Sequence, residues 1–207
     1  MPRGRPPQRT RDQVVAAAVA IADAEGLEAL TMRRLATELG AGVMSLYTYV
    51  RDKDDLVDQM VDRISAYEPA GEPGLLELLR WQRELMLRHP WLPGALPNRR
   101  LTGGNTLRFL DRALAALAPT ALPGGTKMEI IALLTGFVAT FVSHELAQAQ
   151  AGVTDPERIA AQVAELEAAV ATGAYPELAR VLAENTPAAA PNFDTIAERM
   201  INGLVNG

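Results

Sequence analysis

Between residues 31 and 53 the chain carries side chains whose chemistry suits the reading of DNA. Arg33 has a guanidinium fork that can pair with guanine O6 and N7, and the Lys53 ammonium can neutralise a phosphate. Between them lie candidate base-contacting residues: Val43, Met44, Ser45, Thr48 and Tyr49. The apolar members can touch thymine methyls, and the hydroxyl-bearing members can hydrogen-bond to bases or phosphates. The alternative role of Arg33 is that of an ordinary solvated charge on a helix.

These residues fall on two short amphipathic segments that flank Gly40-Ala41-Gly42. Apolar residues recur at helical spacing in both segments, which predicts helices over 32–39 and 43–49. Thr31 can cap the first helix, and Gly40 can adopt the left-handed conformation that ends it. A helix over 10–25 precedes them, and Asp52 can cap a further helix. This order predicts a helix-turn-helix, whose second helix can enter the major groove; the alternative is a helical hairpin whose Leu and Tyr residues only form a core.

The same stretch resembles the DNA-binding domain of the tetracycline repressor (TetR) family. The resemblance rests on the order Thr31-x-Arg33-x-Leu35-Ala36, Leu39-Gly40, Leu46-Tyr47-x-Tyr49 and Lys53-x-x-Leu56. It implies that Thr31, Tyr47 and Lys53 contact phosphates and that Arg33 reaches a guanine. Ala41-Gly42 stands where the family frequently has Val-Ser, and Tyr49 stands where it frequently has His. The fold is little affected by these departures, but the operator sequence is not predictable.

Residues 1–9 combine three prolines with three arginines and are expected to form an extended basic arm. Within the arm, Pro2-Arg3-Gly4-Arg5-Pro6 resembles the core of an AT-hook, an extended element that lies in the minor groove of A·T-rich DNA. A narrow minor groove attracts arginine, so Arg3 and Arg5 are candidate DNA contacts. The alternative is a cationic tail that adds only phosphate affinity.

Composition allows a local DNA-binding surface on an acidic protein and argues against an enzyme. The 207 residues have a net charge of -5, but residues 1–53 hold eight Lys and Arg against six Asp and Glu. The basic excess therefore lies at the front of an otherwise acidic chain. With no Cys and only two His, we expect no metal site, no cofactor and no catalytic residue, and the familiar catalytic motifs are missing. A chain without Cys also fits a cytoplasmic location.

Two apolar runs resemble targeting or membrane segments. Residues 14–22 follow a basic start, as in a signal peptide, but their apolar residues fall on one helical face. Residues 130–143 contain no charge, yet fourteen residues are too few for a membrane span of roughly twenty. We expect a buried helix there and no membrane partner.

Proline and glycine divide the rest of the chain into helices. Residues 66–74 read as a linker, because two Pro and two Gly lie among nine residues. Helices are predicted near 75–88, 103–118, 126–150, 155–172 and 191–205, with shorter turns around 90–97 and 176–184. The predicted fold is all-α, with an arm (1–9), a three-helix DNA-binding domain (10–53), a connecting helix and linker (54–74) and a helical ligand-binding and dimerisation domain (75–207). Leu87-Arg-His-Pro-Trp-Leu92 is typical of the ligand-binding domain of the same family.

Residues 126–150 are apolar on more than one face, with Ile130, Leu134, Phe137, Val138 and Phe141 assigned to one side. Such a helix must be buried from several directions. One face could line a pocket, and another could meet its two-fold mate together with the C-terminal helix; alternatively, both helices only complete a monomer core. The pocket candidates are aromatic or apolar residues and one histidine: Trp81, Met86, Trp91, Leu96, Phe109, Phe137, Phe141 and His144. His144 beside Glu145 could hold a polar ligand group, or could be an ordinary surface or core histidine.

The resemblance implies a regulator, most often a repressor, that binds a palindromic double-stranded DNA operator as a homodimer. In that family a small molecule, here expected to be hydrophobic or aromatic, changes the spacing of the two recognition helices. Operator binding needs them roughly 34–36 Å apart, so the change releases the DNA. The alternative function is a constitutive, architectural DNA-binding protein that has no effector.

Overall fold

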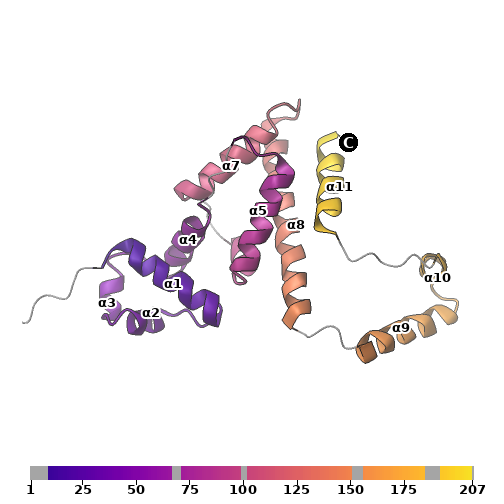
Figure 1. Ribbon diagram of the computed structural model, residues 1–207, viewed down its shortest axis with the longest axis horizontal. Helices are drawn as coiled ribbons and strands as arrows, with labels where there is room; N and C mark the ends of the chain where they lie inside the picture. Colours follow the sequence, from indigo (N-terminus) through magenta and orange to yellow (C-terminus); the bar gives the residue numbers. More distant parts are fainter. Residues whose placement is uncertain (1–8, 67–70, 99–101, 151–155, 185–191, 207) are drawn as a thin grey trace, which may run out of the picture.

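The computed structural model describes residues 9–66, 71–98, 102–150, 156–184 and 192–206, and all regular elements in these ranges are helices (Figure 1). The first four form an N-terminal unit: α1 (Arg11–Glu25), α2 (Met32–Glu38), α3 (Val43–Leu46) and α4 (Lys53–Ile64). The rest are α5 (Leu75–Arg88), α6 (Leu92–Ala95), the 3-10 turn η1 (Leu96–Asn98), α7 (Gly104–Ala116), α8 (Gly124–Gln150), α9 (Pro156–Ala171), α10 (Pro176–Ala183) and α11 (Phe193–Asn206). The predicted all-α class is confirmed.

Side-chain caps fix where the N-terminal helices begin. The Thr31 hydroxyl accepts a hydrogen bond from the Arg34 backbone N–H at 3.0 Å, and the Asp52 carboxylate accepts one from Asp55 at 2.7 Å. Thr10 forms a reciprocal capping box at the start of α1. Each cap satisfies a backbone donor that the first turn of a helix leaves free. The predicted starts at Thr31 and Asp52 are therefore confirmed.

The turn between α2 and α3 depends on Gly40, whose φ is 55°. The Gly40 N–H donates to the Thr37 carbonyl at 3.0 Å, and the Ala41 N–H donates to the Ala36 carbonyl at 2.9 Å. This pair of bonds is a Schellman motif, which ends a helix and needs a left-handed residue at the position of Gly40. It redirects the chain from α2 into α3.

Helix α3 is shorter than predicted: it ends at Leu46, and residues 47–49 form a turn where the sequence suggested helix. Gly42 gives α3 no side-chain cap. The hydroxyl of Ser45 donates to the Gly42 carbonyl at 2.6 Å, and the hydroxyl of Thr48 donates to the Ser45 carbonyl. Such local side-chain bonds compete with the backbone bonds that would extend the helix. Elsewhere, α8 begins two residues before the predicted 126, and residues 176–183 form a helix instead of a turn.

The N-terminal core is built from α1, α2, α3 and α4 together. Leu35, Leu46, Leu56 and Met60 are each at most 1% exposed. Since α4 supplies two of these side chains, it belongs to this core as well as connecting it to the following domain.

In the second region, α5, α6, α7 and α11 all contact α8. The buried stripe of α8 contains Ile130, Leu134, Val138 and Val142, which recur every four residues. Phe137 and Phe141 were expected on this side, but they lie outside the buried stripe. They pack on Phe193 of α11, with ring centroids 5.6 and 5.2 Å away. The sequence could not assign them, because their partner lies more than fifty residues along the chain.

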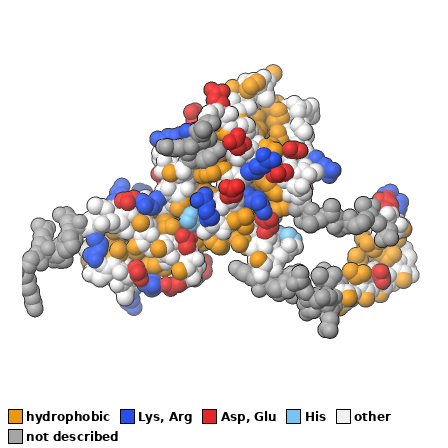
Figure 2. Space-filling view, in the orientation of Figure 1, with side chains coloured by type: hydrophobic (Ala, Val, Ile, Leu, Met, Phe, Trp, Pro, Cys, Tyr) orange, Lys and Arg blue, Asp and Glu red, His pale blue; other side chains and the backbone are white. Residues whose placement is uncertain are grey.

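Helix α8 also has the length and composition of a membrane span over residues 124–149, within which an 18-residue window has a mean hydropathy of 1.7 and 28% of its residues buried. In the structure it is a core helix with one face left exposed. Helices α9 and α10 contact each other and stand apart from the main body in Figure 1. Figure 2 shows hydrophobic side chains gathered over this pair.

Helix α3 has Leu46 in the core and Met44 on the surface. Leu46 is 1% exposed and Met44 is 80% exposed. Leu46→Ala should destabilise the protein by ~2–5 kcal/mol, because it leaves a cavity in the core. Met44→Ala should change the free energy of unfolding by no more than about 0.5 kcal/mol. Urea unfolding of the two variants measures both, and equal losses would contradict the packing described here.

Candidate nucleic-acid interface and ligand cavity

The helix-turn-helix presents most of the predicted DNA contacts to solvent. The exposed members are Thr31, Arg33, Met44, Ser45, Tyr47, Thr48 and Lys53. Val43 and Tyr49 were also expected to point outwards, but both are half-buried and pack against the core. They do so because Val43 shares the apolar face of Leu46, while Tyr49 lies in the turn after α3. Arg3 and Arg5 lie outside the described residues.

Two adjacent arginines on α2 have different environments. Arg34 ties α2 to α1, since its guanidinium donates to Glu25 at 2.6 Å and to Glu38 of its own helix at 2.8 Å. The hydrogen bonds lower the pKa of Glu25 and raise that of Arg34. Arg33 is exposed, and its side chain makes no hydrogen bond or ion pair with the part of the chain that the structure describes. Its guanidinium is therefore available to an external partner.

The N-terminus of α4 adds further cationic groups. Lys53 is exposed, with its ammonium 3.4 Å from the Leu27 carbonyl. Arg51 donates to Asp55 through its backbone N–H at 2.8 Å and its guanidinium at 3.0 Å. Burial of Asp55 opposes its ionisation, but these two hydrogen bonds outweigh burial and hold its pKa below the usual value. The ionised Asp55 thus leaves Arg51 paired, while Lys53 is held only through one long bond to a carbonyl.

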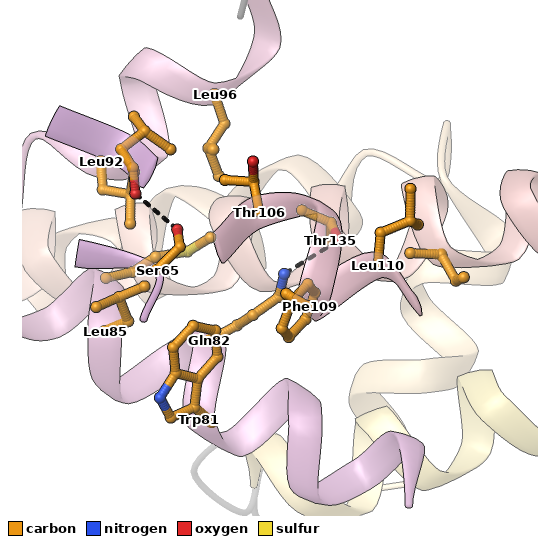
Figure 3. A pocket seen from close by; sticks show the side chains of 13 residues that line it. Ser65, Trp81, Gln82, Leu85, Leu92, Leu96, Thr106, Phe109, Leu110 and Thr135 are labelled. Carbon is orange, nitrogen blue, oxygen red and sulfur yellow. Dashed lines mark hydrogen bonds between the residues drawn. The ribbon is translucent and has the colours of Figure 1, made fainter. Parts of the chain in front are cut away.

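A cavity of about 110 Å³ lies between α4 and the helices of the second domain (Figure 3). Side chains of α4, α5, α6, η1, α7 and α8 line it: Val61, Ser65, Trp81, Gln82, Leu85, Met86, Leu92, Leu96, Thr106, Phe109, Leu110, Ile131 and Thr135. Trp81 and Phe109 stack against each other, with ring centroids 5.2 Å apart. None of the lining residues carries a charge, so the cavity suits an apolar or aromatic molecule.

Four of the predicted pocket residues line this cavity, namely Trp81, Met86, Leu96 and Phe109. The other four do not. Trp91 is buried and donates its indole N–H to Asp23 of α1 at 2.7 Å, while Phe137 and Phe141 belong to the aromatic cluster with Phe193. His144 is exposed and hydrogen-bonds to Gln148 at 2.7 Å; the adjacent Glu145 is ion-paired with Arg83 at 2.6 Å.

The remaining lining residues are aliphatic or polar, so the expectation of aromatic and methionine walls did not include them. A helical-spacing rule finds several of them. On α5, Gln82 and Leu85 lie between Trp81 and Met86 and share their face. On α7, Thr106 lies three residues before Phe109 and Leu110 lies one residue after it. On α8, Ile131 and Thr135 are four residues apart. Val61 and Ser65 carry no such signal, because their helix had been assigned to the connection.

Asp62 of α4 joins the N-terminal unit to α7. Its Oδ1 accepts hydrogen bonds from the backbone N–H groups of Asn105 at 2.9 Å and Thr106 at 3.0 Å. The N-cap of α7 is Gly103, which has no side chain to do this. A Cβ on Gly103 would overlap the carboxyl group of Asp62. The glycine is therefore what lets a residue from another helix cap α7.

A second contact joins α1 to the region between α5 and α6. Asp23 Oδ1 lies 2.8 Å from His89 Nδ1 and accepts the Trp91 indole N–H. These residues follow α5 directly and precede Leu92, which lines the cavity. Both contacts between the two regions thus adjoin the cavity wall.

Among the described residues, no group of three or more His, Asp or Glu side chains could hold a metal ion.

Comparison with known proteins relates both regions to one family. Residues 14–60 match the model of bacterial regulatory proteins of the tetR family, and residues 73–207 match the tetracyclin repressor-like C-terminal domain. The chain is 39% identical to the HTH-type transcriptional repressor DrrR1 of Streptomyces coeruleorubidus over 217 aligned residues, covering 98% of this chain and 79% of the relative.

Solved structures give the same relationship. Apo ActR of Streptomyces coelicolor superposes with a TM-score of 0.77 and 30% identity, covering 97% of this chain and 96% of ActR. ActR in complex with actinorhodin also gives a TM-score of 0.77, with 31% identity over 96% of this chain and 98% of ActR.

The two neighbouring arginines provide a matched test of the exposed surface. Arg33→Ala should weaken binding to a specific DNA site by about 5- to 150-fold, the range for one lost guanine contact, and leave the thermal stability unchanged. Arg34→Ala should lower Tm, because it removes the ion pairs to Glu25 and Glu38, with a smaller effect on DNA affinity at a temperature where it is folded. Fluorescence anisotropy and thermal unfolding give the two readouts. A larger loss of DNA affinity in Arg34→Ala than in Arg33→Ala would reverse the assignment.

Proposed function

This chain belongs to the tetracycline repressor family and is a DNA-binding transcriptional regulator; we propose that it represses from a palindromic operator as a homodimer. A small hydrophobic or aromatic effector enters the cavity of the second domain and releases the operator. The exposed guanidinium of Arg33, which pairs with no described residue and lies beside the recognition helix α3, carries the DNA part of this proposal. The protein acts in the cytoplasm, where bacterial DNA lies.

In the proposed complex, α3 enters the major groove and Arg33 pairs with a guanine. Met44 and Ser45, on the exposed side of α3, contact base edges. Thr31, Tyr47 and Lys53 contact phosphates around them, and these contacts position the helix without reading the sequence. With only four residues, α3 offers few base contacts, so one half-site gives limited specificity. A second head on the same DNA would supply the rest, which is one reason to propose a dimer.

The free face of α8 supports the homodimer. Ala132, Leu133, Gly136 and Thr140 are exposed on the side of α8 opposite its buried stripe, and Leu133 is 57% exposed. An apolar face with small residues allows close helix packing, and α11 beside it exposes parts of Ile196 and Met200. Two copies that bring these helices together form a four-helix interface with two-fold symmetry. That symmetry matches a palindromic operator.

The effector acts through α4 in this proposal. Val61 and Ser65 of α4 line the cavity, and Asp62 between them caps α7, which lines it as well. A ligand that displaces α7 therefore displaces the C-terminal end of α4. The other end of α4 carries Lys53 and packs in the core of the DNA-binding unit. Displacement of α4 alters the separation of the two heads and lowers DNA affinity by linkage.

The experiment that tests the proposal is selection of bound duplexes from a random pool at moderate salt. We expect enrichment of a palindrome whose half-sites are centred one or more helical turns apart, bound by two copies of the chain. Binding to all sequences alike, with strong dependence on salt, would replace the specific regulator with an architectural DNA-binding protein.

The cap of α7 gives a second prediction. Asp62→Ala should cost about 0.5–2 kcal/mol of stability, as other lost caps do, and should bring the ratio of operator Kd with and without effector closer to one. Asp62→Asn keeps an acceptor oxygen and should retain both properties. Gly103→Ala should act like Asp62→Ala, since its Cβ takes the space of the carboxyl group. The measurement is operator binding with an effector found by a release screen; full coupling in Asp62→Ala would exclude this route.

A further inference from the structure

One residue of the cavity lining has an acceptor that no described residue satisfies. Its polar lining side chains are Ser65, Gln82, Thr106 and Thr135. The Ser65 hydroxyl donates to the Val61 carbonyl at 2.7 Å, and the Thr106 hydroxyl donates to the Gly103 carbonyl at 2.8 Å. Both hydroxyl protons are thus used within the local helix turns, which leaves Gln82 and Thr135 as the polar pair that faces a ligand.

Gln82 is the more informative of the two. It is only 8% exposed, and its Nε2 donates to Thr135 Oγ1 at 3.3 Å, which holds the amide in place across the cavity (Figure 3). Its Oε1 is fully buried and accepts no hydrogen bond from the described part of the protein. A buried acceptor without a donor destabilises the protein, so a ligand that supplies the donor recovers that free energy.

The surrounding side chains define the rest of the ligand. Trp81 and Phe109 offer aromatic surface, and the aliphatic walls make the lining almost entirely apolar. No lining residue is acidic or basic, so an ionised ligand group would be buried without a counter-charge. A cavity of about 110 Å³ is on the scale of one aromatic ring, since a dry cavity of about 150 Å³ holds benzene.

We infer that the effector is a neutral aromatic molecule whose hydroxyl group donates a hydrogen bond to Gln82 Oε1, with Thr135 holding the amide in that orientation. Gln82 is then the residue that sets specificity: it favours aromatic alcohols over aromatic hydrocarbons and ethers of the same shape. This inference rests on the proposed function for the biological meaning of the ligand, but it concerns binding to the cavity itself.

The test uses three one-ring probes of similar shape: p-cresol, toluene and 4-methylanisole. Titration calorimetry on the full chain at neutral pH, without DNA, gives a Kd for each. We expect p-cresol to bind about tenfold more tightly than either of the other two, the effect of about 1.4 kcal/mol from one hydrogen bond to a buried acceptor. Gln82→Leu should retain toluene binding and lose the preference for p-cresol.

Three variants make the test specific. Gln82→Met also removes the amide and puts a flexible side chain in its place. It is used instead of Gln82→Leu if thermal unfolding shows that Gln82→Leu does not fold. Thr135→Val should reduce the preference part of the way, because it frees the amide to rotate. Gln59→Leu, at a glutamine that lies on α4 outside the cavity and donates to Asp55, should keep it in full.

Several outcomes would overturn the inference: equal affinity for the three probes, no binding of any probe, an ether that matches the phenol, or a preference that survives in Gln82→Leu and Gln82→Met. Operator release is measured separately with the selected DNA. Selective binding of p-cresol, with no release by any larger phenol, would contradict the effector mechanism and leave the specificity of Gln82 standing. Release by other molecules, with no preference for the phenol among the three probes, would leave the effector mechanism standing and contradict the specificity of Gln82.

Discussion

The hydrogen bonds from Asn105 and Thr106 to the carboxylate of Asp62 decide how the two regions of this chain sit together. A helix usually caps itself with a residue at its own start, but α7 begins at two glycines and takes its cap from α4. The end of α7 therefore cannot move without breaking two backbone hydrogen bonds or carrying α4 with it. Since α4 supplies Leu56 and Met60 to the core of the DNA-binding unit, the cap links that core to the cavity.

A second connection attaches the DNA-binding unit to the other domain at a different point. Asp23 near the end of α1 holds His89 and Trp91 just before α6, so α1 is attached at one side of the cavity and α4 at the other. Arg63 of α4 pairs with Asp12 of α1, which ties the two helices to each other near the α7 junction. A displacement of one attachment relative to the other turns the DNA-binding unit as a body, because its own core is closely packed.

The features that the sequence predicted are those fixed by neighbours along the chain. Thr31, Gly40 and Asp52 act within three residues of their own positions, so residue type and spacing were enough to place the helix ends. The length of α3 was overestimated because hydroxyl bonds to carbonyls compete with helix extension. Phe137 and Trp91 satisfy the same aromatic criterion as Trp81, yet they pack on distant helices. Which aromatic faces a cavity depends on long-range packing that a single sequence does not reveal.

The walls of the cavity differ in how freely they can yield to a ligand. Arg83 of α5 pairs with Glu145 of α8 and lies 5.4 Å from the Phe193 ring centroid, while Arg80 pairs with Asp194 of α11. These ion pairs raise the pKa of both arginines, which therefore stay charged, so α5, α8 and α11 are braced together at any physiological pH. The α4–α7 side is held instead by the hydrogen bonds that Asn105 and Thr106 donate to Asp62, next to the glycine turn.

An effector larger than one ring exceeds the cavity of about 110 Å³ and acts where it displaces the lining. The wall that leads to α4 is held by the hydrogen bonds of Asn105 and Thr106 to Asp62 and not by the arginine ion pairs of α5. A ligand that binds better when this wall is displaced weakens operator binding, and the operator weakens ligand binding by the same coupling free energy. A ligand that fits without opening the cavity would bind and yet leave the DNA in place, because it does not distinguish the two states. Displacement of the wall, and not occupancy alone, is thus what makes a ligand of this cavity an effector.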